Sequence, residues 1–243
     1  MITSEKKERI IDQHVENINA LRAPSGLFMA SAHDVSTGYN KAWLRDNFYT
    51  ALAYEYIDDW ETVRAVWKSI LTIFLKHEEK ISWAAQNRPL ESWQYIHARY
   101  NPDTFEEYWE EWGNKQNDAV GAILFKLGEL EESGHGVIET ENEKRVVQRL
   151  IDYLASIEYW HDPDNGVWEE YEEVHASSVG ACVAGLKKMA KLPYLNVPEE
   201  LIAHGEKALE ELLPRESETK FVDLALLSLI YPYQVVSREL ALE

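Results

Sequence analysis

Helices with one hydrophobic face alternate along this chain with helices that are apolar on nearly every side. Apolar residues spaced three and four apart predict amphipathic helices at 5–21, 60–76, 141–157 and 198–213. Segments with almost no charged face predict buried helices at 41–57, 119–130, 177–189 and 221–230. No useful length of chain alternates apolar and polar residues as a strand does. The chain is therefore expected to be all-α.

The simplest arrangement that buries every second helix has two concentric layers, with inner helices ringed by outer ones. About eight helices are predicted, and we expect a single domain over 1–243. Polar pairs at 117–118 and 177–178 are expected to cap two of the inner helices. By analogy with membrane helices, small residues let the inner helices approach closely. They are Gly121, Ala122, Gly180, Ala181, Ala184 and Gly185.

A different pattern fills 81–114, which has no clean periodicity and is crowded with aromatic residues. They are Trp83, Trp93, Tyr95, Tyr100, Phe105, Tyr108, Trp109 and Trp112. A long irregular stretch in a compact domain is usually functional, and aromatic side chains on rigid loops can stack on sugars or nucleobases. The alternative, equally open for each residue, is that it fills the core.

Charge narrows the range of partners. The chain has 43 acidic and 24 basic residues and a net charge of −19, which argues against nucleic acid and against an anionic membrane surface. The first residues lack an apolar leader segment, and no window approaches the ~20 apolar residues of a membrane span. We therefore expect a cytoplasmic protein. The one cysteine, Cys182, lies in an apolar run and is expected to be a buried thiol.

Polar and aromatic clusters stand at the predicted starts of the inner helices. They comprise Trp43-Leu44-Arg45-Asp46, Trp112 with Gln116-Asn117-Asp118, Trp168-Glu169-Glu170, and Lys220 with Asp223. If the inner helices run parallel, all four clusters meet at one rim, where the positive helix ends favour carboxylates.

This combination of residues suits acid catalysis on a neutral, hydroxyl-rich substrate. Glu169 is the candidate general acid, because a neighbouring carboxylate can raise its affinity for a proton. Arg45 and Asp46 offer hydrogen bonds to hydroxyl groups. Two alternatives remain open: Glu169 and Glu170 belong to a solvated acidic run, and Arg45 with Asp46 forms a structural ion pair.

Other chemistries lack their motifs. The run Asp162-Pro163-Asp164-Asn165-Gly166 resembles a calcium loop only superficially, because the second residue is Pro and the downstream ligand spacing is missing; we expect an ordinary Asp-Asn-Gly turn here. No glycine-rich phosphate loop occurs, and the eight histidines lack the spacing of a zinc site. We expect neither a metal nor a cofactor.

Three ordered motifs resemble those of family 15 glycoside hydrolases, which include glucoamylases and glucodextranases. They are Ala42-Trp43-Leu44-Arg45-Asp46-Asn47, Trp112-Gly113-x-x-Gln116-x-Asp118, and Gly166-Val167-Trp168-Glu169-Glu170 followed by His175-Ala176-Ser177-Ser178-Val179-Gly180. The chain is similar also to the related domain of phosphorylase kinase alpha and beta subunits, especially over 212–227. The resemblance covers the chain from about residue 20 to its end.

The resemblance implies an (α/α)6 toroid of twelve helices, of which this chain has about eight. It also implies that Glu169 is the general acid and Glu170 a substrate-binding carboxylate, that Trp112 stacks on substrate, and that Arg45 and Asp46 bind the terminal glucose. Asp118 and Trp168 match motif positions and are expected to contact substrate as well. The substrate class implied is an α-glucan or oligosaccharide.

The chain departs from the hydrolases at the catalytic base. The family inverts configuration, so a second carboxylate should stand roughly 6.5–9.5 Å from the acid to activate water. The base of the hydrolases lies beyond the point where this sequence stops. An incomplete ring would also expose an apolar seam. Three hypotheses follow: a truncated hydrolase, a ring completed by a second chain, or a noncatalytic glucan-binding or regulatory module.

Overall fold

The computed structural model describes residues 3–32, 38–108, 110, 112–239 and 241, and within these ranges its regular secondary structure is almost entirely helical. Trp109 lies outside them. The helices are α1 (Ser4–Asn19), α2 (Leu44–Tyr56), α3 (Trp60–Lys76), α4 (Glu78–Gln86), α5 (Asn117–Ser133), α6 (Glu141–Ile157), α7 (Ala176–Met189), α8 (Glu199–Leu212) and α9 (Leu227–Ile230). The 3-10 helices are η1 (Ser92–Gln94) and η2 (Leu224–Leu226), and strand β1 (Ala42–Trp43) pairs antiparallel with β2 (Arg99–Tyr100). The expected all-α class is confirmed.

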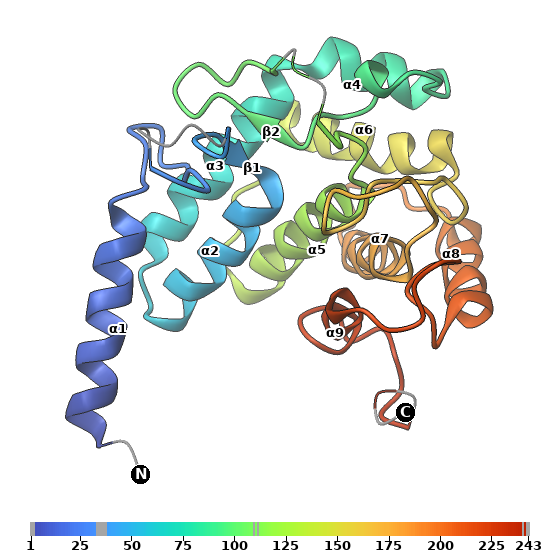
Figure 1. Ribbon diagram of the computed structural model, residues 1–243. Helices are drawn as coiled ribbons and strands as arrows, with labels where there is room; N and C mark the ends of the chain where they lie inside the picture. Colours follow the sequence, from blue (N-terminus) through green and yellow to red (C-terminus); the bar gives the residue numbers. More distant parts are fainter. Residues whose placement is uncertain (1–2, 33–37, 109, 111, 240, 242–243) are drawn as a thin grey trace.

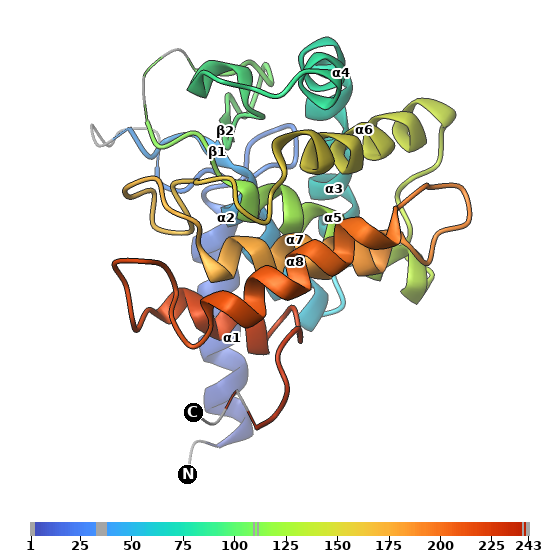
Figure 2. The same cartoon turned by 90° about the vertical axis from the view of Figure 1, so that its right-hand side faces the viewer.

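Helices α2, α5 and α7 form the inner layer, and α3, α6 and α8 pack outside them (Figures 1 and 2). The burial of the helices follows the sequence pattern. Every residue of α5 from 117 to 128 is buried, as is every residue of α7 from 176 to 186, whereas α8 buries only Leu201, Gly205 and Leu209. Within the described residues, no helix is long and apolar enough to cross a membrane.

The two central helices, α5 and α7, run parallel and touch through glycine. A Cβ atom on Gly185 would lie 2.6 Å from the carbonyl oxygen of Gly121, and one on Gly128 would lie 2.6 Å from the Cβ of Lys188. Residues early in α5 therefore meet residues early in α7, and later residues meet later ones. The expected role of small residues in close helix packing is confirmed at these positions. Parallel packing brings the two N-terminal ends together.

Both of these helix ends are capped from outside the helix, so the sequence-based cap assignments were wrong. The Oδ2 atom of Asp164 accepts from the backbone N–H of Asn117 at 2.9 Å, and Glu216 accepts from the N–H of Ser177 at 3.1 Å. In each case a carboxyl oxygen satisfies a backbone N–H that would be costly to leave unpaired in the interior. These caps tie the helix starts to the loops that precede α7 and α9.

Two elements differ from expectation. Part of the aromatic-rich stretch is helical, because α4 runs from Glu78 to Gln86. The helix predicted at 221–230 is reduced to η2 and the single turn α9. Its apolar side chains are largely exposed: Val222 is 80%, Leu224 72% and Leu227 57% accessible. A longer apolar helix gains stability from burial on all sides, and these residues lack that cover. We refer to this exposed apolar surface at 221–231 as the apolar seam.

Replacing Gly185 with Ala tests the close approach of α5 and α7. In a free helix this change is stabilising by about 1 kcal/mol. Here the new methyl group would meet the backbone of Gly121 and the Cβ of Leu124 at 2.9 Å. We expect a net loss of about 2 kcal/mol in the free energy of unfolding, measured by urea denaturation. A variant as stable as the parent would contradict this packing.

Candidate functional site

A pocket of about 680 Å³ opens beside the N-terminal ends of the inner helices. One wall comes from the start of α2, with Trp43, Arg45 and Asp46; another comes from the turn that carries Trp168 and Glu169. The third wall comes from η2 and α9. The structure therefore brings together clusters that are more than a hundred residues apart in the sequence.

Glu169 stands at the centre of this arrangement, with a side chain that is 12% exposed. Its Oε1 atom accepts from the indole N–H of Trp43 at 2.5 Å, the amide of Gln116 at 3.1 Å and the guanidinium of Arg45 at 3.4 Å. Its Oε2 atom accepts from the indole N–H of Trp112. Both carboxylate oxygens are thus engaged by donors from two segments, one at the start of α2 and one just before α5.

The turn that carries Glu169 is fixed against the segment that leads into α5. The backbone N–H of Asn165 donates to the carbonyl of Lys115 at 2.7 Å, and the Asn165 side-chain amide donates to the carbonyl of Glu170 at 2.8 Å. Glu169 itself has a φ of +59°, in the left-handed region, and Gly166 has +62°. Left-handed backbone at a residue other than glycine, Asn or Asp is uncommon and is found where the surroundings dictate it.

Arg45 links Glu169 to the start of α5. Its NH1 group lies 3.0 Å from the Oδ2 atom of Asp118 and 2.7 Å from the side-chain oxygen of Gln116. Burial lowers the pKa of Arg45, but the charges of Asp118 and Glu169 outweigh burial and leave the pKa raised. The sequence suggested an ion pair between Arg45 and Asp46; the buried ion pairs that form join Arg45 to Asp118 and Glu169 instead.

Asp46 and Asp118 both act on the charge of Arg45, but only Asp46 lines the pocket. Asp46 lines the pocket and is half-buried, and burial raises its pKa against the effect of Arg45. Asp118 is only 3% exposed, pairs with Arg45 and is not part of the pocket lining. Asp46 can therefore meet a ligand directly, whereas Asp118 acts on a ligand through the position of Arg45.

The two tryptophans expected to contact substrate lie in different surroundings. Trp168 is 52% exposed in the pocket wall, and its indole N–H donates to Asp223 at 2.6 Å. Trp112 packs edge-on against Tyr39 and Trp43, with the guanidinium of Arg99 4.8 Å from the centre of its ring. Trp168 therefore offers an open aromatic surface, and Trp112 supports the position of Glu169.

Glu170 faces away from the pocket lining. Its carboxylate forms an ion pair with Lys220, which also lies 3.2 Å from Asp223. Since Asp223 accepts from Trp168, these contacts connect the turn at 168–170 to the segment before η2. The fourth predicted cluster, Lys220 with Asp223, thus contacts the Trp168-Glu169-Glu170 cluster and orients Trp168.

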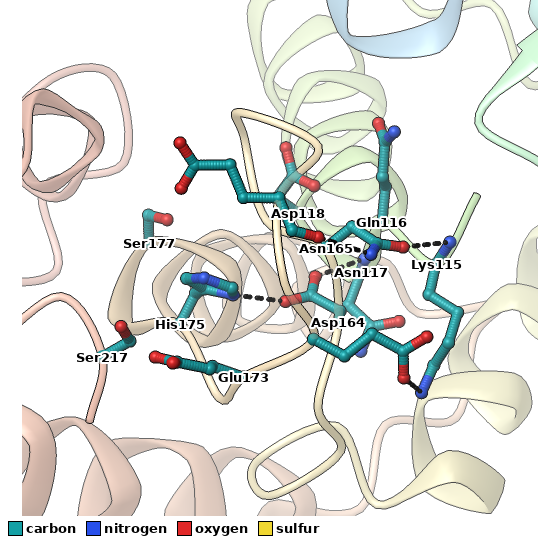
Figure 3. Close-up of polar contacts among 12 residues, drawn as sticks. Lys115, Gln116, Asn117, Asp118, Asp164, Asn165, Glu173, His175, Ser177 and Ser217 are labelled. Atoms are coloured by element: carbon teal, nitrogen blue, oxygen red, sulfur yellow. Dashed lines mark hydrogen bonds and ion pairs between the residues drawn. The ribbon is translucent and has the colours of Figure 1, made fainter. Parts of the chain in front are cut away.

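A buried polar network that sequence reasoning missed lies beneath the site (Figure 3). Asp164 is fully buried, caps α5 and bonds the Nδ1 atom of His175 at 2.9 Å. Burial lowers the pKa of His175, but the hydrogen bond and charge of Asp164 outweigh this and leave it raised. The Asp-Asn-Gly turn was the only sign of Asp164 in the sequence, and we assigned Asp164 to that turn alone.

Glu216 is the second missed residue. It is 1% exposed, its carboxylate accepts from both the backbone N–H and the hydroxyl of Ser177, and burial raises its pKa to about 7. Its distance along the chain from Ser177 hides this contact from any local pattern. Together with Asp164, it fixes the ends of the inner helices on which the site stands.

The fold and site define the class of protein: an all-α chain with the glycosidase (α/α)6 fold, whose polar residues meet at the ends of parallel inner helices. The family description "Glycosyl hydrolases family 15" matches residues 9–199, and the chain belongs to this family. The predicted family resemblance and fold are thereby confirmed.

Solved structures support the fold. A wild-type glycosidase superposes with a TM-score of 0.77 at 18% sequence identity, covering 98% of this chain and 68% of that one. A glycosidase variant in complex with glucose superposes with a TM-score of 0.78 at 19% identity, with the same coverage. Glucoamylase from Hormoconis resinae has a TM-score of 0.57 at 16% identity, covering 84% of this chain and 38% of that one.

Curated relatives come from the second group that the sequence suggested. A probable phosphorylase b kinase regulatory subunit alpha of Drosophila melanogaster is 29% identical over 91% of this chain and 20% of its own length. The skeletal muscle isoform of the rabbit, Oryctolagus cuniculus, is 28% identical over 78% of this chain and 18% of its own length. The chain thus spans about a fifth of the length of these relatives.

The raised pKa of Glu216 predicts a pH-dependent stability. This carboxyl titrates near 4.5 when unfolded and near 7 when folded, so its contribution is complete below pH 4.5 and is lost as the pH rises through about 7. The loss should be about 3 kcal/mol. We expect Glu216→Gln to remove this component from urea unfolding measured between pH 5 and 8.

Glu173→Gln is the matched control. Glu173 is a nearby carboxylate whose pKa is lowered chiefly by a hydrogen bond from Ser217, so its stabilising effect is lost below pH 4.5 rather than above it. A difference between parent and Glu216→Gln that stays constant from pH 5 to 8 would contradict the raised pKa.

Proposed function

We propose that this chain binds the end of an α-glucan in the pocket beside Glu169 and carries the acid half of an inverting glycoside hydrolase site. The observation that carries the proposal is that residues from two of the motif segments converge on the carboxylate of Glu169, which the third motif supplies at the edge of a pocket. Family membership and the glycosidase fold support this choice of substrate class.

Each pocket residue has a role in this proposal. Trp168 stacks on the apolar face of the terminal sugar, and Arg45 and Asp46 bind its hydroxyl groups. Glu169 gives a proton to the glycosidic oxygen as the bond to C1 breaks. For this step a carboxyl oxygen must be free, so the substrate has to displace one of the donors that now hold Glu169. Glu170 and Trp112 act by holding the turn and the indole donors in place.

The catalytic base is the missing part of this mechanism. An inverting hydrolase needs a second carboxylate roughly 6.5–9.5 Å from the acid. Among the described residues that line the pocket, the only other carboxylate is Asp46, which we assign to binding. We therefore propose that this chain alone releases little or no glucose from maltooligosaccharides.

The second candidate is a noncatalytic glucan-binding or regulatory module. Two observations favour it: both oxygens of Glu169 already accept hydrogen bonds, and the curated relatives are described as kinase regulatory subunits. In such a module the same pocket binds a glucan end without cleaving it.

Azide distinguishes the two candidates, because it is a nucleophile that needs no base. If Glu169 is an acid, azide attacks C1 from the side opposite the leaving oxygen, the C1–oxygen bond breaks, and Glu169 protonates that oxygen. We expect the parent protein to convert maltoheptaose slowly to β-glucosyl azide, detected by mass spectrometry and NMR. Glu169→Gln should form none.

Glu172→Gln serves as the matched control, since this residue belongs to the same acidic run but bonds Lys115 at 2.9 Å outside the pocket lining. It should form the azide product at the parental rate. Binding of maltoheptaose without any azide product would favour the noncatalytic module. Rapid glucose release without azide, lost in Glu169→Gln, would show that a base is present in this chain.

We also propose that a second chain covers the apolar seam at 221–231 and completes the ring of helices. The exposed side chains support this proposal, since contiguous apolar surface of this kind marks interaction sites. The protein should self-associate in sedimentation experiments at micromolar concentration, and Val222→Asp should weaken this. Leu90→Asp, at an 84% exposed leucine away from the seam, is the control. A parent protein that stays monomeric would contradict the proposal.

A further inference from the structure

A second pocket, of about 1000 Å³, lies in the aromatic-rich part of the chain. It shares no lining residue with the pocket beside Glu169. The residues that matter for its chemistry are Lys80, Trp83, Trp93, His97, Glu107 and Tyr108. In Figure 1, α4 and α9, which contribute to the two different pockets, lie on opposite sides of the inner helices.

Charges around this pocket are paired within the protein. Lys80 lies 2.9 Å from both carboxylate oxygens of Glu107, and Lys76 lies 2.6 Å from Glu106. Burial, followed by the charges of Lys80 and Arg99, lowers the pKa of His97 to about 3, so this imidazole is neutral at physiological pH. The pocket therefore holds no unpaired charge among these groups, and a neutral ligand suits it better than an ion.

Two indole rings are displayed to solvent at the pocket. Trp83 is 42% exposed and Trp93 is 67% exposed, which is unusual for such large apolar side chains. Trp83 projects from α4. Trp93 lies in η1, which is fixed because the side-chain oxygen of Gln94 accepts from the N–H groups of Leu90 and Glu91 at 2.8 and 2.9 Å. The indoles thus stand on ordered supports and bind with little loss of conformational freedom.

A neutral ligand with flat apolar faces and hydroxyl edges matches these features. Pyranose rings present C–H faces that pack on indole, while their hydroxyls can bond the Lys80–Glu107 pair at the wall. Nucleobases also stack on indole, but the phosphates that accompany them in nucleic acid are repelled by a chain of net charge −19. An oligosaccharide can stack on the indole rings and, because it is neutral, is not repelled by the acidic chain.

We propose that the pocket between α4, η1 and the 106–108 segment is a second, noncatalytic binding site for a neutral oligosaccharide chain. Trp83 and Trp93 are its stacking surfaces, and the Lys80–Glu107 pair is its polar wall. The choice of an α-glucan as its ligand rests on the function proposed above. The site would hold an internal stretch of glucan apart from the chain end that enters the pocket beside Glu169.

Calorimetric titration with maltoheptaose tests this site in the full chain. The parent should bind at two sites, and Trp93→Ala and Trp83→Ala should each weaken one of them about tenfold, a factor equal to about 1.4 kcal/mol. Trp93→Phe, which keeps an aromatic face, should restore part of the affinity. Leu90→Ala, at an exposed neighbour outside the pocket lining, should bind as the parent does.

Trp168→Ala makes failure of this inference distinguishable from failure of the proposed function. It should abolish binding at the first pocket and leave the second site intact. Binding that is lost in Trp168→Ala and unchanged in both Trp83→Ala and Trp93→Ala would overturn the second site and retain the first. The reverse pattern would support the second site and overturn the first. Absence of binding to the parent protein would overturn both.

Discussion

The interaction on which this structure depends is the capping of buried, parallel helix ends by carboxylates from distant segments. Parallel packing of α5 and α7 places two positive ends close together in the interior, where unsatisfied N–H groups are costly. Asp164 and Glu216 satisfy these ends by accepting hydrogen bonds from the backbone N–H groups of Asn117 and Ser177. Because they belong to the loops before α7 and α9, these caps also fix the loops. The loops that these caps fix form part of the pocket wall.

Hydrogen-bond donors also explain how several carboxylates can lie close to Glu169. Arg45 lies between Asp118 and Glu169, and the indole groups of Trp43 and Trp112 add donors without adding charge. Arg45 and these uncharged donors hold Glu169, and at the second pocket Lys80 and Glu107 pair with each other. Both sites therefore suit neutral, hydroxyl-bearing ligands, in agreement with the strongly acidic composition of the chain. Membership of glycosyl hydrolase family 15 explains the presence of the motifs, and the structure shows where each motif residue lies.

Local patterns predicted what depends on periodicity, and they failed where contacts span the sequence. The apolar character of 119–130 and 177–189 predicted buried helices, and glycines at 121 and 185 predicted their close packing. Nothing near Ser177 announces Glu216 as its partner, and the Asp-Asn-Gly turn gave no sign that Asp164 would cap α5. The neighbouring positions of Arg45 and Asp46 suggested a pair, although successive residues on a helix point in different directions. The segment 221–231 is apolar and was expected to be buried, yet it is exposed because the surrounding structure does not cover it.

If the end of a glucan binds in the pocket beside Glu169, as proposed, the donors to Glu169 should sense the ligand. NMR of the tryptophan indole N–H groups measures this most directly, because Trp43 and Trp112 both donate to that carboxylate and Trp168 lines the pocket. During titration with maltotriose, the assigned signals of these three residues should shift along one saturable curve. Signals from all three that stay unchanged at saturating maltotriose would contradict the account.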